Sequence, residues 1–244
     1  MDWARELYDD FRMKHGFGSI PKSRTAKEVD FLVDRLALGG GKRVLDLFCG
    51  TGRHCVELAK RRIDATGVDV NPRYLAVAAG EARRAGVSPA FIEGDVREVD
   101  LGVDYDAVII MYQSFGYFDD VEERRLLRRV HDALKSGGRF LIEILNRDSI
   151  LRNFQAVSER EYAGVRVVEE REFDVLTSRI YATIRRFESG GVVERTVNWR
   201  MYSAHEIRSM CEDAGLRFVA GYSNIQGQPL TLNARLMRLV FERE

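Results

Sequence analysis

The sequence predicts an α/β protein: a doubly wound, mostly parallel seven-stranded sheet with a small inserted antiparallel β meander. Three observations support this fold class. Buried-strand patterns alternate with helical segments from about residue 43 to residue 145. Three strand patterns with hairpin-length links follow, and the strand and helix order then resumes. Parallel neighbours in a sheet need crossover connections, and the intervening helices provide them.

Composition places this chain among ordinary globular proteins. Of its 244 residues, 45% are hydrophobic and 31% are charged, which is enough for a sizeable core. Lys+Arg and Asp+Glu both number 38, and a zero net charge gives no electrostatic argument for nucleic-acid binding. The sequence contains no apolar run of the roughly 18–20 residues that span a membrane. We therefore expect neither a nucleic-acid nor a membrane partner.

Cysteine usage and the first residues indicate the compartment. The three cysteines show no CxxC or Cys/His spacing, so neither a disulfide framework nor a structural metal site is expected. The start, MDWARELYDDF, is charged and lacks the apolar core of a signal peptide. These features predict free thiols, no metal and a cytoplasmic location.

Two helices are expected before the first strand. The segment from Asp2 to about His15 has apolar residues at helical spacing, among them Trp3, Leu7, Tyr8 and Phe11. Thr25 and Glu28 have the spacing of a capping box, which predicts that a second helix starts there and ends at Gly39. We assign residues 1–154 and 203–244 to the core, with the N-terminal helices in 1–38, and residues 155–202 to the insertion.

The core pattern predicts the remaining elements in order. Pro72 is well suited to the first turn of a helix, and Gly86 to its end. Ser203 and Glu206 form a second capping-box pattern, which opens a helix to about Ala214. The expected core strands are 43–48, 65–70, 90–93, 106–111, 139–145, 216–222 and 236–242, and the other core helices are 53–62, 72–85 and 119–135. The three strands expected in the insertion are 165–173, 178–188 and 192–202.

A glycine turn after the first core strand is the most informative motif. The run VLDLFCGTGRH leads from a strand through Gly50 and Gly52 into a helix. Glycines let the backbone approach a ligand closely, and the amides at the helix N-terminus point toward that ligand. Asp46 lies within this strand and is a candidate for ligand binding. A purely structural role is the alternative for this residue.

Acidic residues follow the next two strands. Asp69 ends the second strand about 20 residues past Gly50, where a carboxylate can accept both hydrogen bonds of a ribose diol. Asp95 follows the third strand, where it can accept from an adenine amine or cap its own loop. Met111 closes the fourth strand, at the expected ligand crevice of an open α/β sheet.

These motifs resemble the class I S-adenosylmethionine-dependent methyltransferases over roughly residues 25–145, and the last two strands fit the antiparallel close of that Rossmann-like fold. The resemblance implies S-adenosylmethionine as cofactor, without a metal. It places Asp46, Gly50, Thr51 and Gly52 at the methionine part, Asp69 at the ribose and Asp95 with Val96 at the adenine. Met111 or Tyr112 would flank the sulfonium. The full set of expected cofactor residues is Tyr8, Asp46, Cys49, Gly50, Thr51, Gly52, Asp69, Val70, Asp95, Val96 and Met111.

The turn departs from the family pattern at one position, because Phe48 stands where many members have a glycine. A dinucleotide-binding enzyme is the alternative reading of the turn. Its fingerprint needs a third glycine, and Cys55 occupies that position here. The turn also lacks the basic support that a pyrophosphate needs.

The acceptor site is expected beyond the fourth and fifth strands. The candidate acceptor residues are Tyr112, Gln113, Tyr117, Asn146, Arg147, Arg200 and Tyr202. Loop packing is the alternative for the first three, a helix cap for Asn146 and Arg147, and ordinary strand alternation for the last two. Insertions like this meander occur in small-molecule methyltransferases. It is expected to cover the site or to pair with a second copy as a homodimer.

The predicted reaction is an in-line displacement on the cofactor's methyl group by an N or O atom, or a C atom, of a small-molecule acceptor. The protein contributes mainly positioning and exclusion of water, with a general base only where the nucleophile must lose a proton. Tyr112, Tyr117, His54 and Tyr202 are candidate bases, and no catalytic residue is assigned. An RNA or protein methyltransferase and a non-catalytic cofactor-binding protein remain as alternatives.

Overall fold

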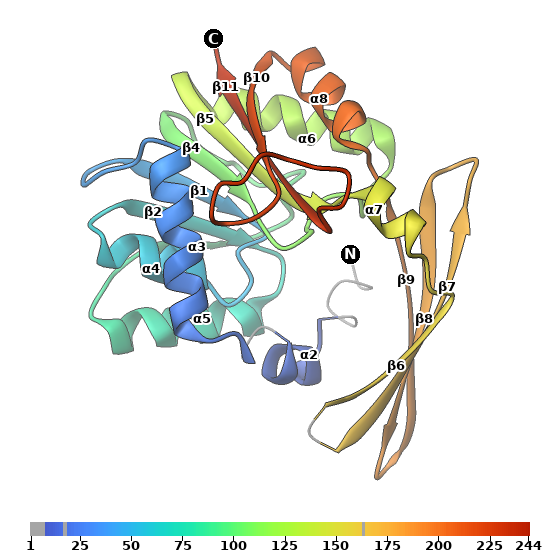
Figure 1. The fold of residues 1–244 in the computed structure, drawn as a ribbon. Helices are drawn as coiled ribbons and strands as arrows, with labels where there is room; N and C mark the ends of the chain where they lie inside the picture. Colours follow the sequence, from blue (N-terminus) through green and yellow to red (C-terminus); the bar gives the residue numbers. More distant parts are fainter. Residues whose placement is uncertain (1–7, 17–18, 163) are drawn as a thin grey trace.

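The computed structural model describes residues 8–16, 19–162 and 164–244. Its main sheet has seven strands in the order β10-β11-β5-β4-β1-β2-β3 (Figure 1). All pairs are parallel except β10 with β11 and β11 with β5. The predicted doubly wound, mostly parallel sheet is therefore confirmed, and its chain order reverses between β1 and β4.

Most elements lie close to the predicted ranges, but β5 starts at Leu134 instead of Arg139, α2 starts only at Asp10, and α7 was not predicted. The strands of the main sheet are β1 (Arg43–Leu47), β2 (Asp64–Asp69), β3 (Ala90–Glu93), β4 (Tyr105–Ile110), β5 (Leu134–Leu145), β10 (Leu216–Tyr222) and β11 (Leu236–Arg243). The helices are α2 (Asp10–His15), α3 (Lys22–Arg35), α4 (Arg53–Lys60), α5 (Pro72–Ala85), α6 (Asp120–Ala133), α7 (Arg147–Arg152) and α8 (Ala204–Asp213). The part of the first predicted helix that precedes Tyr8, with Trp3 and Leu7, lies outside the described residues.

Helices cover both faces of the main sheet (Figure 1). Val29, Leu32 and Leu58, from α3 and α4, belong to the buried cluster on one face. Leu127 of α6 and Met210 of α8 belong to the cluster on the other face. Within the described residues, no helix is long and apolar enough to cross a membrane.

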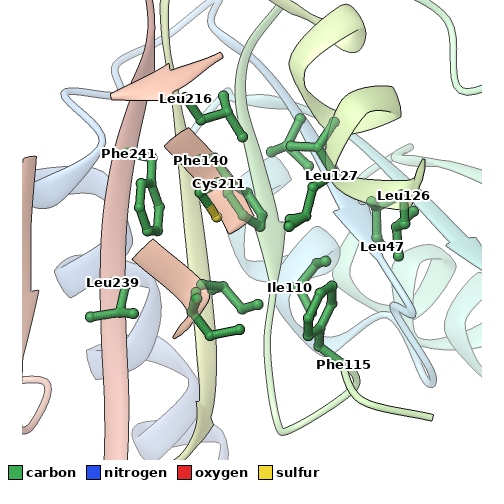
Figure 2. Close-up of a cluster of buried hydrophobic side chains, with 14 of the residues drawn as sticks. Leu47, Ile110, Phe115, Leu126, Leu127, Phe140, Cys211, Leu216, Leu239 and Phe241 are labelled. Carbon is green, nitrogen blue, oxygen red and sulfur yellow. The ribbon is translucent and has the colours of Figure 1, made fainter. Parts of the chain in front are cut away.

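The second of these clusters forms the larger core (Figure 2). Ile110 of β4, Phe140 of β5 and Phe241 of β11 have at most a trace of solvent exposure. The rings of Phe140 and Phe241 stack with their centroids 6.1 Å apart. Burying such side chains contributes roughly 1.5–3 kcal/mol each, so this layer holds rigid the strand ends that carry the site.

The insertion folds as a separate four-stranded antiparallel sheet, in the order β6-β7-β8-β9. Its strands are β6 (Val157–Tyr162), β7 (Val165–Asp174), β8 (Arg179–Glu188) and β9 (Gly191–Arg200). The sequence predicted only three of them. The charged strand β6, VSEREY, was missed because its hydrophobic alternation is weak and its register depends on pairing with β7.

The two predicted capping boxes have different outcomes. The Thr25–Glu28 prediction is wrong, because α3 begins at Lys22 after Pro21 and Thr25 lies inside the helix. The Ser203–Glu206 prediction is confirmed, since each side chain of this pair accepts a hydrogen bond from the other residue's backbone N–H. Glu28 instead points into the interior and is 1% exposed.

Removing the confirmed cap is expected to weaken α8. Replacing Ser203 by alanine leaves the Glu206 N–H without its acceptor. The free energy of unfolding should fall by about 1 kcal/mol, measured by urea denaturation. A Ser23→Ala substitution, in the first turn of α3 where no side-chain cap exists, serves as the control. Equal losses in both variants would contradict the assigned cap.

Candidate functional site

A cavity lies at the carboxyl ends of β1 and β4, where the chain order of the sheet reverses. Nine predicted cofactor residues line it: Tyr8, Asp46, Cys49, Gly50, Thr51, Asp69, Val70, Val96 and Met111. Gly52 and Asp95 are absent from its lining. The lining also contains His54, which the sequence indicated as a candidate contact of substrate or cofactor. The lining residues that the sequence did not indicate as cofactor contacts are Phe48, Arg53, Asn71, Tyr74, Gly94, Ser114 and Phe118.

The turn after β1 adopts the left-handed conformation at alternate positions. Phe48, Gly50 and Gly52 have φ values of 60°, 57° and 67°. Phe48, at the position where many family members have glycine, therefore keeps a glycine-like backbone at some energetic cost. A Cβ on Gly52 would lie 2.7 Å from the Cβ of Ala78. The second glycine is thus required by packing against α5.

The carboxylate of Asp69 is fixed by the backbone of the turn. The Gly50 N–H donates to its Oδ2 at 2.8 Å, and the Asn71 N–H donates to its Oδ1 at 2.8 Å. Burial nevertheless raises the pKa of this carboxyl group. Each oxygen keeps a further lone pair, so the carboxylate can accept from two hydroxyl groups of a ligand.

Asp46 lies within β1, just before the glycine turn, and is 2% exposed. Its Oδ2 accepts a weak hydrogen bond from the Cys55 thiol at 3.5 Å. Burial raises the pKa of Asp46 to about 7, against the opposing effects of Cys55 and the Arg53 charge. The group is therefore half ionised near neutral pH and responds to any cation placed beside it.

Arg53, the first residue of α4, completes this end of the cavity. Its Nη1 donates to the carboxylate of Glu28 and, at 3.2 Å, to the Thr25 hydroxyl. Its Nη2 is buried and has no hydrogen-bond partner among the described residues. A buried guanidinium donor without a partner is costly, which indicates a site for an anionic group. The sequence signal that could have indicated Arg53 is its position directly after Gly52, at the start of the helix.

His54 also lines the cavity, but it serves the buried ion pairs. Its Nε2 lies 3.3 Å from Glu28 Oε2. Burial and the adjacent Arg53 charge lower the pKa of His54 to about 4. The imidazole is therefore neutral at pH 7 and hydrogen-bonded to Glu28, and its low pKa makes it a weak base.

The Asp95 side chain does not line the cavity, although a contact with the adenine amine was predicted for it. Its carboxylate accepts from the Arg97 backbone N–H at 2.9 Å and from the Arg97 guanidinium at 2.7 Å. Only its neighbours Gly94 and Val96 line the cavity. The loop-capping alternative therefore describes its contacts in the structure.

A second, larger cleft adjoins this cavity and lies between the core and the four-stranded sheet. Tyr8, Tyr112 and Tyr117 line both spaces. The hydroxyl groups of Tyr8 and Tyr117 lie 2.9 Å apart. Gln113 lines the cleft, and the strands β7, β8 and β9 form its far wall with Val167, Ile184, Val193, Val197 and Trp199.

The backbone at the junction of the two spaces is strained. Tyr112 and Gln113 have φ values of 60° and 58°, a conformation unfavourable for side chains of their size. Their N–H groups donate to the side chain and the backbone carbonyl of Glu143 at 3.3 and 3.1 Å. Such strain persists where the surroundings fix it, and it concentrates at ligand sites.

The junction tyrosines are poor bases. Burial raises the pKa of Tyr8, Tyr112 and Tyr117 above the usual value. They therefore stay neutral at pH 7, where they can orient a ligand by hydrogen bonds and cannot take up its proton. The raised pKa values argue against a tyrosine as the general base. They favour an acceptor whose nucleophilic atom is already deprotonated when it binds.

Two predicted acceptor residues after β5 have structural roles instead. The Asn146 side chain caps α7 by accepting from the Asp148 N–H, and its amide donates to the Ala234 carbonyl at 3.0 Å. Arg147 pairs with Glu206 at 2.7 Å. Neither residue lines the cavity or the cleft, so the helix-cap alternative describes Asn146.

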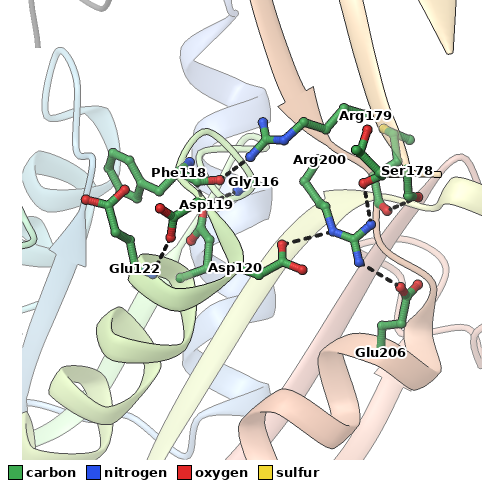
Figure 3. A network of polar contacts seen from close by, with 12 residues as sticks. Gly116, Phe118, Asp119, Asp120, Glu122, Ser178, Arg179, Arg200 and Glu206 are labelled. Atoms are coloured by element: carbon green, nitrogen blue, oxygen red, sulfur yellow. Dashed lines mark hydrogen bonds and ion pairs between the residues drawn. The ribbon is translucent and has the colours of Figure 1, made fainter. Parts of the chain in front are cut away.

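Arg200 and Tyr202 are also directed away from both spaces. Figure 3 shows Arg200 between Asp120 and Glu206, at 3.0 and 3.2 Å from their carboxylates. Tyr202 is 1% exposed and packs against Phe115 in the core. We correct both to residues that dock the insertion on the core, which the strand pattern could not distinguish from cleft residues.

Known proteins that are similar to this chain are methyltransferases. The methyltransferase domain family matches residues 44–138. A putative methyltransferase of Geobacillus sp. (strain WCH70) is 34% identical over 43% of this chain and 43% of its own length. A glycine/sarcosine N-methyltransferase of Aphanothece halophytica is 30% identical over 62% of this chain and 58% of its own length. The matches thus span between two fifths and three fifths of these relatives.

Among solved structures, the CcbJ methyltransferase from Streptomyces caelestis has the same fold. The two structures superimpose with a TM-score of 0.82 and 21% identity, over 99% of this chain and 96% of the other. This likeness covers the inserted sheet as well as the core. Residues 44–138 therefore match a methyltransferase domain, and the chain as a whole has the fold of a methyltransferase of known structure.

Proposed function

We propose that this protein transfers the methyl group of S-adenosylmethionine to a nitrogen or oxygen atom of a small-molecule acceptor. The observation that carries the proposal is the meeting of two spaces at Tyr8, Tyr112 and Tyr117. One space is lined by the glycine turn and the strand-end acids, and the other is covered by the inserted sheet. A donor and an acceptor bound in them would meet at the three tyrosines.

The residues of the first cavity fit the three polar parts of the cofactor. Asp69 presents free lone pairs for a ribose diol. Asp46 and the Arg53 Nη2 offer an acid for the ammonium and a donor for the carboxylate of the methionine end. Asp95 could accept from the adenine amine only beside its bond to Arg97, so its cofactor role stays a prediction.

The protein's part in the reaction is to position the acceptor and to exclude water. When bound, S-adenosylmethionine supplies an electrophilic methyl group on a positively charged sulfur. The tyrosines at the junction orient the attacking atom by hydrogen bonds, and the inserted sheet shields it from solvent. Because these tyrosines keep their protons, a neutral amine is the acceptor that the site suits best.

Calorimetric titration tests the cofactor assignment first. S-adenosylmethionine and S-adenosylhomocysteine should bind with micromolar affinity, and NADH should not bind. Binding of NADH alone would restore the dinucleotide alternative. If none of these ligands gives a binding heat with folded protein, the proposal is overturned.

Other acceptors and assemblies are tested separately. A salt-sensitive shift of labelled tRNA would favour an RNA methyltransferase, and the zero net charge counts against it. A cofactor-binding protein without catalysis would need no second cleft, and one is present.

Two further proposals concern assembly and location. The first is a homodimer through the edge strands of the inserted sheet. The second is a cytoplasmic location, which three buried free thiols support. Light scattering checks the first.

Cofactor affinity is expected to depend on the ionisation of Asp46. The carboxyl group, with a pKa of about 7, is mostly neutral at pH 6 and mostly ionised at pH 8. A positively charged ammonium group binds the ionised form more tightly, so affinity for S-adenosylhomocysteine should rise with pH across this window, by at most about tenfold per pH unit. The Asp46→Asn variant should show a flat profile. A rise that persists in this variant would assign the effect to another group.

A further inference from the structure

The inner face of the four-stranded sheet changes character along its length. Next to the core, Phe173, Ile180 and Trp199 lie side by side in register. Farther along the same strands, the paired rows contain Glu169 with Arg195, and then Arg160 with Arg186. At about 3.3 Å per residue, these rows lie roughly 13–20 Å from Trp199. The cleft wall is therefore apolar next to the core, and toward the free end of the sheet charged side chains alternate with Ile184, Val167 and Val193.

Arginine dominates the charge of the cleft. Among the described residues, its lining contains six arginines (Arg12, Arg160, Arg171, Arg186, Arg195 and Arg235) and a single acid, Glu169. Two of the arginines are neutralised within the structure. Arg186 pairs with Asp9 at 2.6 Å, and Arg171 pairs with Glu169 at 2.7 Å. Arg195 is also engaged, since its Nη1 donates to the Glu194 carbonyl at 2.9 Å.

Arg12, Arg160 and Arg235 have no ion pair with another residue that the structure describes. The guanidinium of Arg12 lies over the Tyr8 ring, 5.7 Å from its centroid, and so reaches the junction with the cofactor cavity. Arg160 extends from the edge strand β6 into the cleft.

The electrostatics of Glu169 support a cationic cluster. Burial tends to raise the pKa of this carboxyl group, but the Arg171 hydrogen bond and the charges of Arg171, Arg12 and Arg160 outweigh burial and lower it. Three guanidinium groups therefore act on one carboxylate, which leaves an excess of positive charge beside an apolar wall.

We propose that Arg12 and Arg160 form an anion-binding site in the acceptor cleft, which takes a carboxylate or phosphate group of an acceptor with an apolar body. The assignment rests on the proposed methyltransferase function, because it names the acceptor class of that same cleft. The apolar body contacts Trp199 and the valines of the sheet, and the anionic group lies on the guanidinium cluster. Arginine suits this role because its planar fork binds both groups with two hydrogen bonds.

The test compares a charged probe with its neutral analogue. Calorimetric titrations are run on the protein saturated with S-adenosylhomocysteine, using 4-phenylbutyrate and 4-phenylbutyramide, which share an apolar body. We expect the carboxylate to bind at least about tenfold more tightly, and this preference to shrink as ionic strength rises. Phenyl phosphate and acetate are added as further probes. Tighter binding of phenyl phosphate assigns the phosphate source, and acetate should bind weakly because it lacks the apolar body.

Two cleft variants and one matched control identify the residues. Arg12→Gln and Arg160→Gln should each remove most of the preference for the carboxylate. Arg166→Gln removes the same charge from the adjacent strand β7, but Arg166 is exposed and bonded to Glu159, and it lies outside the cleft lining. This control should keep the preference. Thermal unfolding confirms that the variants are folded.

The outcomes separate this assignment from the proposed function. Equal binding of the acid and the amide, no binding of the acid, or the same loss in Arg166→Gln overturns the anion site. Binding of acetate as tight as that of 4-phenylbutyrate overturns the apolar part of the acceptor class. S-adenosylhomocysteine is titrated into each variant first, and its failure to bind the unchanged protein would count against the methyltransferase proposal instead.

Discussion

Replacing Asp69 by alanine is expected to weaken the binding of S-adenosylhomocysteine by about 2–3 kcal/mol, which is roughly 30- to 150-fold. Two ligand hydroxyl groups would lose a charged acceptor. The Gly50 and Asn71 N–H groups would also lose the carboxylate that fixes them at 2.8 Å. The turn would then close over the ligand less rigidly. Calorimetric titration measures the change directly.

Asp64→Ala is the matched control for this variant. Asp64 begins the same strand, β2, but its side chain is 65% exposed and its Arg43 partner lies 3.8 Å away. An exposed pair of this kind contributes little, so the affinity should stay within about twofold. Unchanged affinity in a folded Asp69→Ala protein would falsify the ribose role.

Replacing Gly52 by alanine is expected to lower the free energy of unfolding by about 2–5 kcal/mol. The left-handed φ of 67° accounts for about 1–2 kcal/mol of this. The remainder is steric, because the new methyl group would lie 2.7 Å from the Ala78 Cβ and 2.7 Å from the Phe91 ring. Ala78 is attached rigidly to α5, so the helix itself would have to move. Urea denaturation gives the loss.

Gly86→Ala isolates the backbone contribution. Gly86 has a φ of 68°, almost the value of Gly52, but a Cβ there would meet nothing within 4 Å. The Gly86→Ala substitution should therefore lower the free energy of unfolding by only about 1–2 kcal/mol. Similar losses at both positions would refute the packing role of Gly52. A stable Gly52→Ala protein that fails to bind S-adenosylhomocysteine would return this glycine to the cofactor site.

Around the glycine turn, local sequence signals located some of the site residues and missed others. The sequence located the turn, Asp46 and Asp69, because a strand, a glycine turn and a strand-end acid are consecutive local signals. It assigned Gly52 to the cofactor, although this glycine is required by its contacts with α5 and β3. It also missed Arg53, whose importance depends on Glu28 and Thr25 on α3, which are distant in sequence.

The acceptor side was predicted less well than the cofactor side. Tyr112, Gln113 and Tyr117 line the cleft, since they directly follow β4 at the sheet edge that any ligand of this fold approaches. Arg200 and Tyr202 do not, because period-2 alternation shows that a strand has two faces without showing which one the cleft occupies. Asn146 could be placed only once α7 was known to start there.

By itself, the sequence determined the alternation of strands and helices, the glycine turn and the order of the strand-end acids, and hence the fold class and the resemblance to methyltransferases. These signals are local, arising from hydrophobic periodicity and backbone conformation within a few residues. The tertiary structure decided which side chains meet: the unpaired Arg53 nitrogen, the three tyrosines shared by two spaces, and the arginine surplus of the cleft. Contacts of this kind depend on the docking of the inserted sheet and α2 on the core, and no local pattern encodes the register of that docking.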